Sequence, residues 1–377
     1  MAREAIVAVA GAAQGNVAAR VQQVLWLLGG IEQVIRPGMR VLLKPNLVAP
    51  FPQATTDLEI LTAIVTAVRA AGGEPVVADS AGFEFDTEAT FAVLGLPAWA
   101  ARLDVLLLNL DREPHASVAS PGWPHGELRV ACCALEADVV INLPKLKRHS
   151  LTRVTLGIKN LMGLLDRDSR RRLHACGIEA GIAALAGLIR PPLTVLDALS
   201  SNTRAVYGIE RALGVVIGGR DPVAVDCYAC SLLGVDPAQI GHLQAAARAG
   251  LGSSAYRVVG TSDLPVETPR AGEGWRQALY RLFFRAMYIV DLSYAAITRH
   301  SLIPYVHYYL GIRPYLDAAR CNRCGDCVAA CPIGAIDLGA PRIIAARCMR
   351  LRCLRCVEAC PQRAITLRGW RRPEAGR

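Results

Sequence analysis

The sequence predicts an α/β fold, in which helices cover both faces of a mainly parallel β-sheet, followed by a smaller α+β domain. Short apolar runs rich in β-branched residues alternate with amphipathic stretches, which is the pattern of repeated strand and helix units. Most of these runs are apolar on both faces, as in parallel strands that lie between two layers of helices. The smaller domain is predicted from two cysteine runs near the C-terminal end.

The strands and helices of the α/β domain can be placed from these runs. The expected strands are Ile6–Ala10, Val41–Asn46, Pro75–Asp79, Val105–Leu110, Val139–Leu143, Leu193–Asp197 and Val215–Gly218. The expected helices are Asn16–Leu28, Leu58–Ala71, Ala175–Leu188, Val223–Leu233 and Pro237–Ala249. Asp221-Pro222 is a typical helix start, and Gly250 and Gly252 end the last of these helices.

Length and composition predict more than one domain. A chain of 377 residues exceeds a comfortable single core, and 53% hydrophobic with 20% charged residues excludes a disordered protein. Ser262–Gly274 is polar and contains several Pro and Gly residues, which is typical of a linker. We therefore expect an α/β domain at 1–262, a linker and amphipathic helical segment at 263–313, a ferredoxin-like domain at 314–369 and a basic tail at 370–377.

Charge and cysteine content narrow the class of protein. The formal net charge is +10, without an aromatic–basic groove motif, so we expect no nucleic-acid partner. A basic surface attracts acidic redox proteins, and a peripheral contact with an anionic membrane stays open. Met1–Ala5 does not begin an export signal, and no run of about 18 apolar residues predicts a membrane span. Thirteen cysteines then favour metal or redox chemistry over disulfides, so we expect a cytoplasmic protein.

The segment Trp275–Leu310 is aromatic and basic. Its aromatic residues are Tyr280, Phe283, Phe284, Tyr288, Tyr294, Tyr305, Tyr308 and Tyr309, and Arg276, Arg281, Arg285 and Arg299 lie among them. Such a segment can lie on a membrane surface. Packing of one domain against another is the commoner role, and we favour it here.

The first cysteine run matches the bacterial ferredoxin pattern at every spacing. It reads C-x2-C-x2-C-x3-C-P, with cysteines at 321, 324, 327 and 331. Three thiolates on a tight loop reach three corners of one cuboidal [4Fe–4S] cluster, and the fourth ligates the other cluster of a two-cluster protein. A structural zinc site would need two separated pairs of ligands, so we expect iron–sulfur chemistry.

The second run is less regular. Cys353, Cys356 and Cys360 fit the second half of the pattern, but the expected first cysteine falls at Arg350, and the nearest candidate is Cys348. A longer loop can still deliver that thiolate at small entropic cost. Crossed ligation assigns Cys321, Cys324, Cys327 and Cys360 to the first [4Fe–4S] cluster, and Cys331, Cys348, Cys353 and Cys356 to the second. Because such clusters are oxygen-sensitive, we expect an anaerobic or well-protected setting.

Polar residues follow several of the predicted strands, where open α/β sheets place their ligand sites. We expect a small anionic ligand, a phosphate or a carboxylate, to be bound by Lys44, Asn46, Asp79, Lys145, Lys147, Lys159 and Asn160. The alternative for the lysines is ordinary exposed surface. Lys145, His149 and Lys159 are the candidates for catalysis, although a lone loop histidine is more often simply polar surface.

Four motifs together resemble the domain-of-unknown-function 362 family. They are Lys44-Pro45-Asn46-Leu47, Asn142-Leu143-Pro144-Lys145-Leu146-Lys147, Gly157-Ile158-Lys159-Asn160-Leu161-Met162-Gly163 and Asp221-Pro222-Val223-Ala224-Val225-Asp226. The resemblance extends from about Ile6 to Ile365 and implies an iron–sulfur protein, since the family is often fused to a two-cluster ferredoxin module. It also implies a Gly-rich acidic segment after Asp197, which the residues Ala198–Gly208 do not match.

Three functions are compatible with these observations. The first is an oxidoreductase in which the α/β domain binds the anionic substrate and the clusters relay electrons. The second is a dedicated electron carrier, or an assembly or docking partner, that has no substrate chemistry. The third is a redox-sensing regulator. Convergence of the lysines on one cavity would favour the first of these, and lysines scattered over the surface would favour the second.

Overall fold

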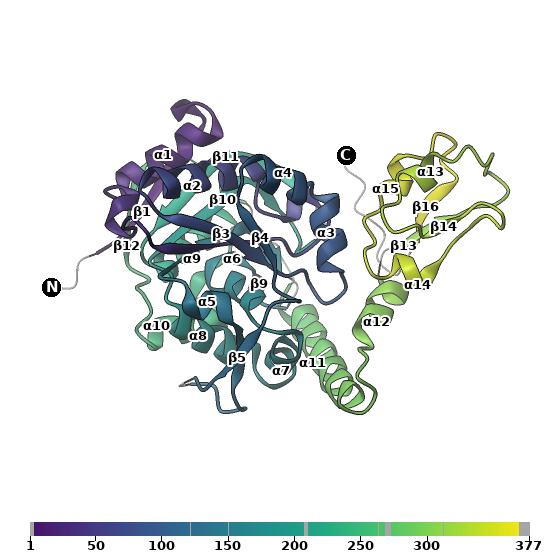
Figure 1. Cartoon of the computed structure of the whole chain (residues 1–377). Coiled ribbons are helices and arrows are strands. Elements are labelled where there is room, and N and C mark those ends of the chain that lie inside the picture. Colours follow the sequence, from purple (N-terminus) through teal and green to yellow (C-terminus); the bar gives the residue numbers. More distant parts are fainter. Residues whose placement is uncertain are drawn as a thin grey trace.

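The computed structural model describes residues 4–120, 122–149, 151–206, 210–262, 264–267, 273–311 and 313–368. It contains a large α/β domain, a smaller C-terminal domain and two helices between them (Figure 1). The predicted basic tail at 370–377 lies outside the described residues, as do Tyr207 and Gly208 of the segment that departs from the family pattern.

The main sheet has the order β12-β1-β11-β10-β7-β2-β3-β4. The strands along this path are β1 (Ala5–Ala10), β2 (Arg40–Pro45), β3 (Glu74–Asp79), β4 (Leu106–Asn109), β7 (Val139–Leu143), β10 (Leu193–Asn202), β11 (Glu210–Gly219) and β12 (Tyr256–Gly260). Neighbours pair in parallel except for β11, which is antiparallel to both β1 and β10. The prediction of a mainly parallel α/β sheet is therefore confirmed.

Helices cover both faces of this sheet (Figure 1). One face carries α1 (Val17–Leu27), α2 (Leu58–Ala70), α3 (Thr87–Val93) and α4 (Leu96–Arg102), whose apolar residues share one core with the strands. The other face carries α5 (Cys132–Glu136), α6 (Leu156–Asn160), α8 (Ile178–Ile189), α9 (Pro222–Leu232) and α10 (Gly241–Arg248), which form the second core. Burial of apolar side chains on both faces explains why the strands lack alternation.

Several elements differ from the sequence prediction. The expected helix Ala175–Leu188 is divided at Gly177, because α7 (Arg167–Cys176) ends before it and α8 begins after it. The expected helix at 237–249 starts with a separate 3₁₀ turn, Pro237–Gln239. The hairpin of β5 (His115–Val118) with β6 (Leu128–Ala131), and the short strands β8 (Lys145–His149) and β9 (Arg153–Val154), were not predicted.

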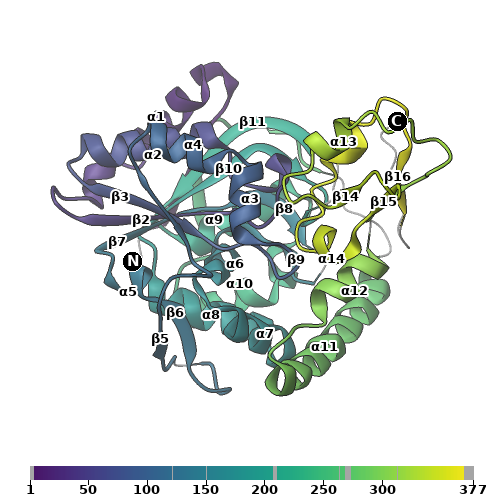
Figure 2. The same ribbon diagram turned by 45° about the vertical axis from the view of Figure 1, so that its right-hand side comes forward.

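Two helices connect the domains. α11 (Glu273–Thr298) packs against α7, and α12 (Ile303–Leu310) turns back along it towards the C-terminal domain (Figure 2). The C-terminal domain consists of β13 (Arg313–Leu316), β14 (Ile336–Asp337), β15 (Arg342–Ile343) and β16 (Ile365–Arg368), with α13 (Asp326–Ala329), α14 (Ala345–Cys348) and α15 (Arg355–Glu358). No helix in the described part of the chain has the length and apolar character needed to cross a bilayer.

Candidate functional site

A cavity of about 180 Å³ lies where β2, β3 and β8 end, beside α6, α7 and α11. Seven of the predicted site residues line it: Lys44, Asn46, Asp79, Lys147, His149, Lys159 and Asn160. These residues are far apart in the sequence, and the parallel strands bring them together because their carboxyl ends meet at one edge of the sheet. The predicted lysines therefore converge, with one exception.

Lys145 is the exception, and it does not line this cavity. Its ammonium lies 3.0 Å from the Asp197 carboxylate and donates a hydrogen bond to the Ser200 hydroxyl at 3.1 Å. Both members of this ion pair are buried. The expectation that Lys145 contacts the same ligand as the other lysines therefore lacks support from the structure, which gives Lys145 a partner of its own.

Lys44 and Asp79 form a buried ion pair at the floor of the cavity, with 2.7 Å between Nζ and Oδ1. Asp79 also accepts hydrogen bonds from the backbone N–H groups of Leu47 and Ser80. Burial lowers the pKa of Lys44, although the neighbouring carboxylate opposes the change. A Cβ at Gly163 would overlap Asp79 and lie 2.7 Å from the Lys44 ammonium, so this position requires glycine.

Among the described residues, Lys147 has no carboxylate partner. Its Nζ donates hydrogen bonds to the Asn46 side-chain oxygen at 2.7 Å and to the Ala54 carbonyl at 2.6 Å. Asn46 in turn donates to Asn160 at 2.8 Å. Burial, together with the positive charges of Lys159 and Lys145, lowers the pKa of Lys147 well below its usual value. An anion in the cavity would favour the charged form of this amine.

Lys159 is the cation that is available to a ligand. It lines the cavity, and within the described ranges its ammonium forms neither a hydrogen bond nor an ion pair. Burial lowers its pKa to about 8. The backbone that carries it is held by Asp226 of α9, whose two carboxylate oxygens accept hydrogen bonds from Gly157 at 2.7 Å and Ile158 at 2.9 Å.

His149 lies in the cavity wall as a neutral imidazole. Its Nδ1 accepts hydrogen bonds from the backbone N–H groups of Leu151 at 3.1 Å and Thr152 at 3.3 Å, which leaves the proton on Nε2. Burial, with the charge of Lys159 next in importance, holds its pKa well below the usual value. This histidine can therefore donate a hydrogen bond from Nε2 to a ligand.

The cysteines of the C-terminal domain enclose two hollows. The first hollow is lined by Cys321, Cys324, Cys327 and Cys360, and the second hollow by Cys331, Cys348, Cys353 and Cys356. These are the two groups that crossed ligation predicts, so the residues present fit two [4Fe–4S] clusters. Cys348 lies in the second hollow because α14 carries it there, despite its displacement from the regular spacing.

Comparisons with known proteins match both parts of the chain. The family described as "Domain of unknown function (DUF362)" matches residues 41–231, and a 4Fe-4S dicluster domain matches residues 313–361. The thylakoid-associated protein sll1697 of Synechocystis sp. is 32% identical over 270 residues, which cover 68% of this chain and 81% of that protein.

The chain belongs to the DUF362 family.

Its C-terminal part is a dicluster domain, so this DUF362 member is an iron–sulfur protein with an electron-transfer role. Among solved structures, the lactate racemase apoprotein from Thermoanaerobacterium thermosaccharolyticum aligns at 13% identity with a TM-score of 0.41. The alignment covers 60% of this chain and 56% of that chain.

Residues of this DUF362 member that were not predicted complete the cavity. Phe83, Glu84, Arg170, His174, Tyr288 and His307 line it. Tyr288 of α11 stacks on His174 at 4.4 Å between ring centroids, and Phe83 meets the Tyr288 ring at 5.6 Å. Burial lowers the pKa of His174 to about 3, so this ring is an uncharged part of an aromatic wall.

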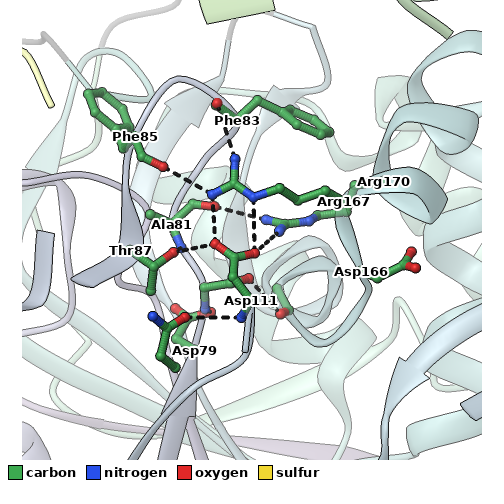
Figure 3. A network of polar contacts seen from close by, with 12 residues as sticks. Asp79, Ala81, Phe83, Phe85, Thr87, Asp111, Asp166, Arg167 and Arg170 are labelled. Carbon is green, nitrogen blue, oxygen red and sulfur yellow. Dashed lines mark hydrogen bonds and ion pairs between the residues drawn. The ribbon is translucent and has the colours of Figure 1, made fainter. Parts of the chain in front are cut away.

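Two arginines of α7, Arg167 and Arg170, hold the loop at 81–85, which contributes Phe83 to this wall (Figure 3). Asp111 pairs with Arg167 at 2.6 Å and with Arg170 at 2.9 Å. Arg167 also donates to the carbonyls of Phe83 and Phe85, and Arg170 donates to that of Ala81. Burial opposes ionisation of Asp111, but hydrogen bonding to Arg167 and the charge of Arg170 lower its pKa. The loop at 81–85 is therefore held in one position.

A short polar chain joins the cavity to the second hollow. His307 lines the cavity, and its Nδ1 lies 3.4 Å from a Glu84 carboxylate oxygen. The same oxygen lies 3.7 Å from Arg352, which lines the second hollow and donates to the His307 carbonyl at 2.7 Å. Burial opposes ionisation of Glu84, but His307 and Arg352 lower its pKa to about 2.

One feature of the composition would have identified the cavity. The chain contains only four lysines, at 44, 145, 147 and 159, and its other basic residues apart from histidine are arginines. Lys44, Lys145 and Lys147 are buried, and Lys159 lies in the cavity. Lysine is the basic residue whose pKa shifts readily on burial, whereas arginine stays charged. Three of the four lysines thus line the cavity, and the fourth, Lys145, is buried in an ion pair with Asp197.

Proposed function

We propose that this protein is an iron–sulfur oxidoreductase that binds a small anionic substrate in the cavity and exchanges electrons with it. The observation that carries the proposal is the contact between the two sites. His307 in the cavity wall and Arg352 in the wall of the second hollow share a hydrogen bond and a common carboxylate partner, Glu84. When bound, [4Fe–4S] clusters supply electrons one at a time.

The charges of the cavity favour an anionic substrate. The Lys44 charge is balanced by Asp79, and that of Arg170 by Asp111. No carboxylate in the described part of the chain pairs with Lys159 or Lys147. Lys159 would bind a carboxylate or phosphate, and the aromatic wall of Phe83 and Tyr288 would contact the rest of the molecule. Since pockets for drug-sized ligands begin at about 300 Å³, a cavity of about 180 Å³ suits a smaller metabolite.

The exposure of the cysteines suggests which cluster would exchange electrons with a partner protein. Cys324 of the first hollow is exposed, beside the exposed arginines Arg323 and Arg363, whereas the second hollow faces the α/β domain. An acidic redox protein would therefore dock beside the first hollow, because opposite charges steer such encounters. Electrons would pass between this partner and the substrate by way of the first cluster and then the second, which lies beside Arg352.

The setting of the protein follows from its cysteines. Eight of them lie in the two hollows. Thiols that must stay free to bind iron are kept reduced in the cytoplasm. We therefore propose a cytoplasmic location under oxygen-poor conditions.

The test is a ligand screen on protein that has been purified and reconstituted without oxygen. Small carboxylic acids and phosphate esters would be titrated by calorimetry, and the cluster potentials would be followed by EPR in the presence of each. We expect a binder that shifts one potential in the wild type and fails to do so in Lys159→Met. If no acid binds and both potentials stay unmoved, a dedicated electron carrier becomes the better description.

A further inference from the structure

The outer face of α11 carries an apolar stripe that no described element of the chain covers. The exposed residues Leu279, Leu282, Phe283, Ile289, Val290 and Ile297 recur at helical spacing along one side, with Leu282 at 65% and Ile297 at 86% exposure. The opposite side packs Phe284 and Tyr288 inwards against α7 and the cavity. Exposed apolar patches of this kind mark interaction surfaces. The helix lies at the lower edge of the molecule in both views (Figures 1 and 2).

Two hydroxyl groups of this helix form hydrogen bonds within the helix itself. The hydroxyls of Ser293 and Thr298 donate to the carbonyls of Ile289 and Tyr294, one turn back in the same helix. Each hydroxyl is therefore satisfied without solvent, which lowers the cost of removing the stripe from water. Tyr305 and Tyr309 of α12 are also exposed, and tyrosine is a residue that favours membrane interfaces.

The charge of this face points to an anionic occupant. In the part of α11 whose side chains are described, the single carboxylate is that of Asp291, which is buried against Arg171, Ser301 and Leu302. Arg285 is exposed at the flank of the helix, where its Nε donates to the Ala175 carbonyl of α7, and Arg299 is exposed just after the helix ends. The whole chain carries a formal charge of +10. A second copy of the chain would bring the same positive charge to the contact, whereas an anionic surface would complement it.

We propose that α11 is a peripheral membrane-docking helix, which lies in the headgroup region of an anionic bilayer with Leu282, Val290 and Ile297 towards the acyl chains. Interfacial helices bind by the area of apolar surface that they bury, with added attraction between basic residues and anionic lipids. The inner face of the same helix closes the cavity, so docking would hold the cavity at a fixed distance from the membrane.

The test is flotation of the full, cluster-loaded protein with vesicles of phosphatidylcholine, with and without phosphatidylglycerol. The test variant is Leu282→Asn/Ile297→Asn, which changes exposed residues only. The matched control is Trp26→Gln, which removes an apolar side chain that is 71% exposed on α1. We expect the wild type and the control to float with the anionic vesicles, and the double variant to lose at least about tenfold in partitioning.

Three results would overturn the proposal. One is a wild type that stays with the unbound fraction at low salt. Another is flotation that the double variant leaves unchanged. The third is a wild type that sediments as a dimer without vesicles and becomes monomeric in the double variant, because the stripe would then be the contact between two copies. Iron content and far-UV circular dichroism equal to those of the wild type show that the double variant is folded.

Discussion

Two hydrogen bonds join Asp86 of the α/β domain to Arg350 of the dicluster domain. The Asp86 backbone N–H donates to the Arg350 carbonyl at 2.6 Å, and the Arg350 guanidinium donates to the Asp86 carboxylate at 2.8 Å. Arg350 occupies the position at which a regular second cysteine run would have its first cysteine. The chain thus has a contact between domains where the standard pattern has a ligand.

This contact leads to a first prediction. The Arg350 side chain is mostly exposed, so Arg350→Ala should cost at most about 1 kcal/mol of unfolding free energy. Asp86→Ala should cost more, about 1–2 kcal/mol, because Asp86 also caps α3 through the Ala89 N–H. Urea denaturation of both variants under anaerobic conditions measures the difference. Equal losses would mean that capping contributes nothing, and Arg355→Ala, another exposed arginine of the same domain, is the control.

A second prediction concerns pH. The pKa of Lys159 is lowered to about 8, so its ammonium is present below pH 8 and is lost as the pH rises above that value. Binding of an anionic ligand should weaken above pH 8 by up to about tenfold per pH unit. Lys159→Arg should remain charged and keep its affinity at pH 9, whereas Lys159→Met should be weak at every pH. Calorimetric titrations at several pH values measure the affinity of the wild type and of both variants. A wild-type affinity that stays constant through pH 8–9 would exclude Lys159 as the binding cation.

A third prediction concerns the Lys44–Asp79 pair. Lys44→Met should cost about 3–5 kcal/mol of stability, because it leaves the buried Asp79 carboxylate without its cation. Lys44→Met/Asp79→Asn should recover part of this loss, since the uncompensated charge is removed. A double-mutant cycle by urea denaturation measures the coupling free energy between the Lys44 and Asp79 side chains. Additive losses would show that the pair acts through packing rather than through charge.

A fourth prediction tests Cys348 as a ligand. Cys348→Ser should lower the iron bound from about eight to about four per chain and remove one of the two paramagnetic centres seen on reduction. Cys176→Ser is the matched control, because this cysteine lies in α7, away from both hollows. Iron and sulfide analysis measures the iron bound per chain, and EPR counts the paramagnetic centres after reduction. An unchanged spectrum in Cys348→Ser would mean that another group completes the second site.

The sequence predicted the parallel sheet and grouped the polar residues at the strand ends of the cavity for a definite reason. Buried parallel strands read as apolar runs, and their ends lie at one edge, so Lys44, Asp79 and Lys147 could be grouped from position alone. The aromatic wall could not be grouped in this way. His174 and Tyr288 come from helices distant in the sequence, and only tertiary packing brings α7 and α11 together.

The position of Lys145 is another feature that the sequence could not predict. Lys145 lies two residues before Lys147 on β8, and regular strand geometry would direct both side chains to the same face. Pairing of β8 with β10 is irregular, since Lys145 lies opposite Asp197 but Lys147 lies opposite Asn202. The two lysines therefore have different surroundings, although their spacing suggests the same one. An irregularity of this kind depends on the partner strand and leaves no local pattern.

Because lysine occurs at only four positions, chemical labelling of lysine would give few signals, and each could be assigned to one residue. Reductive methylation with isotopically enriched formaldehyde would mark only Lys44, Lys145, Lys147, Lys159 and the terminal amine, and the arginines that cover the rest of the surface would stay silent. Lys159, whose amine is the least encumbered, should react first. The filling of the cavity could then be followed in the intact molecule from the methyl signal of Lys159, without a bulky probe.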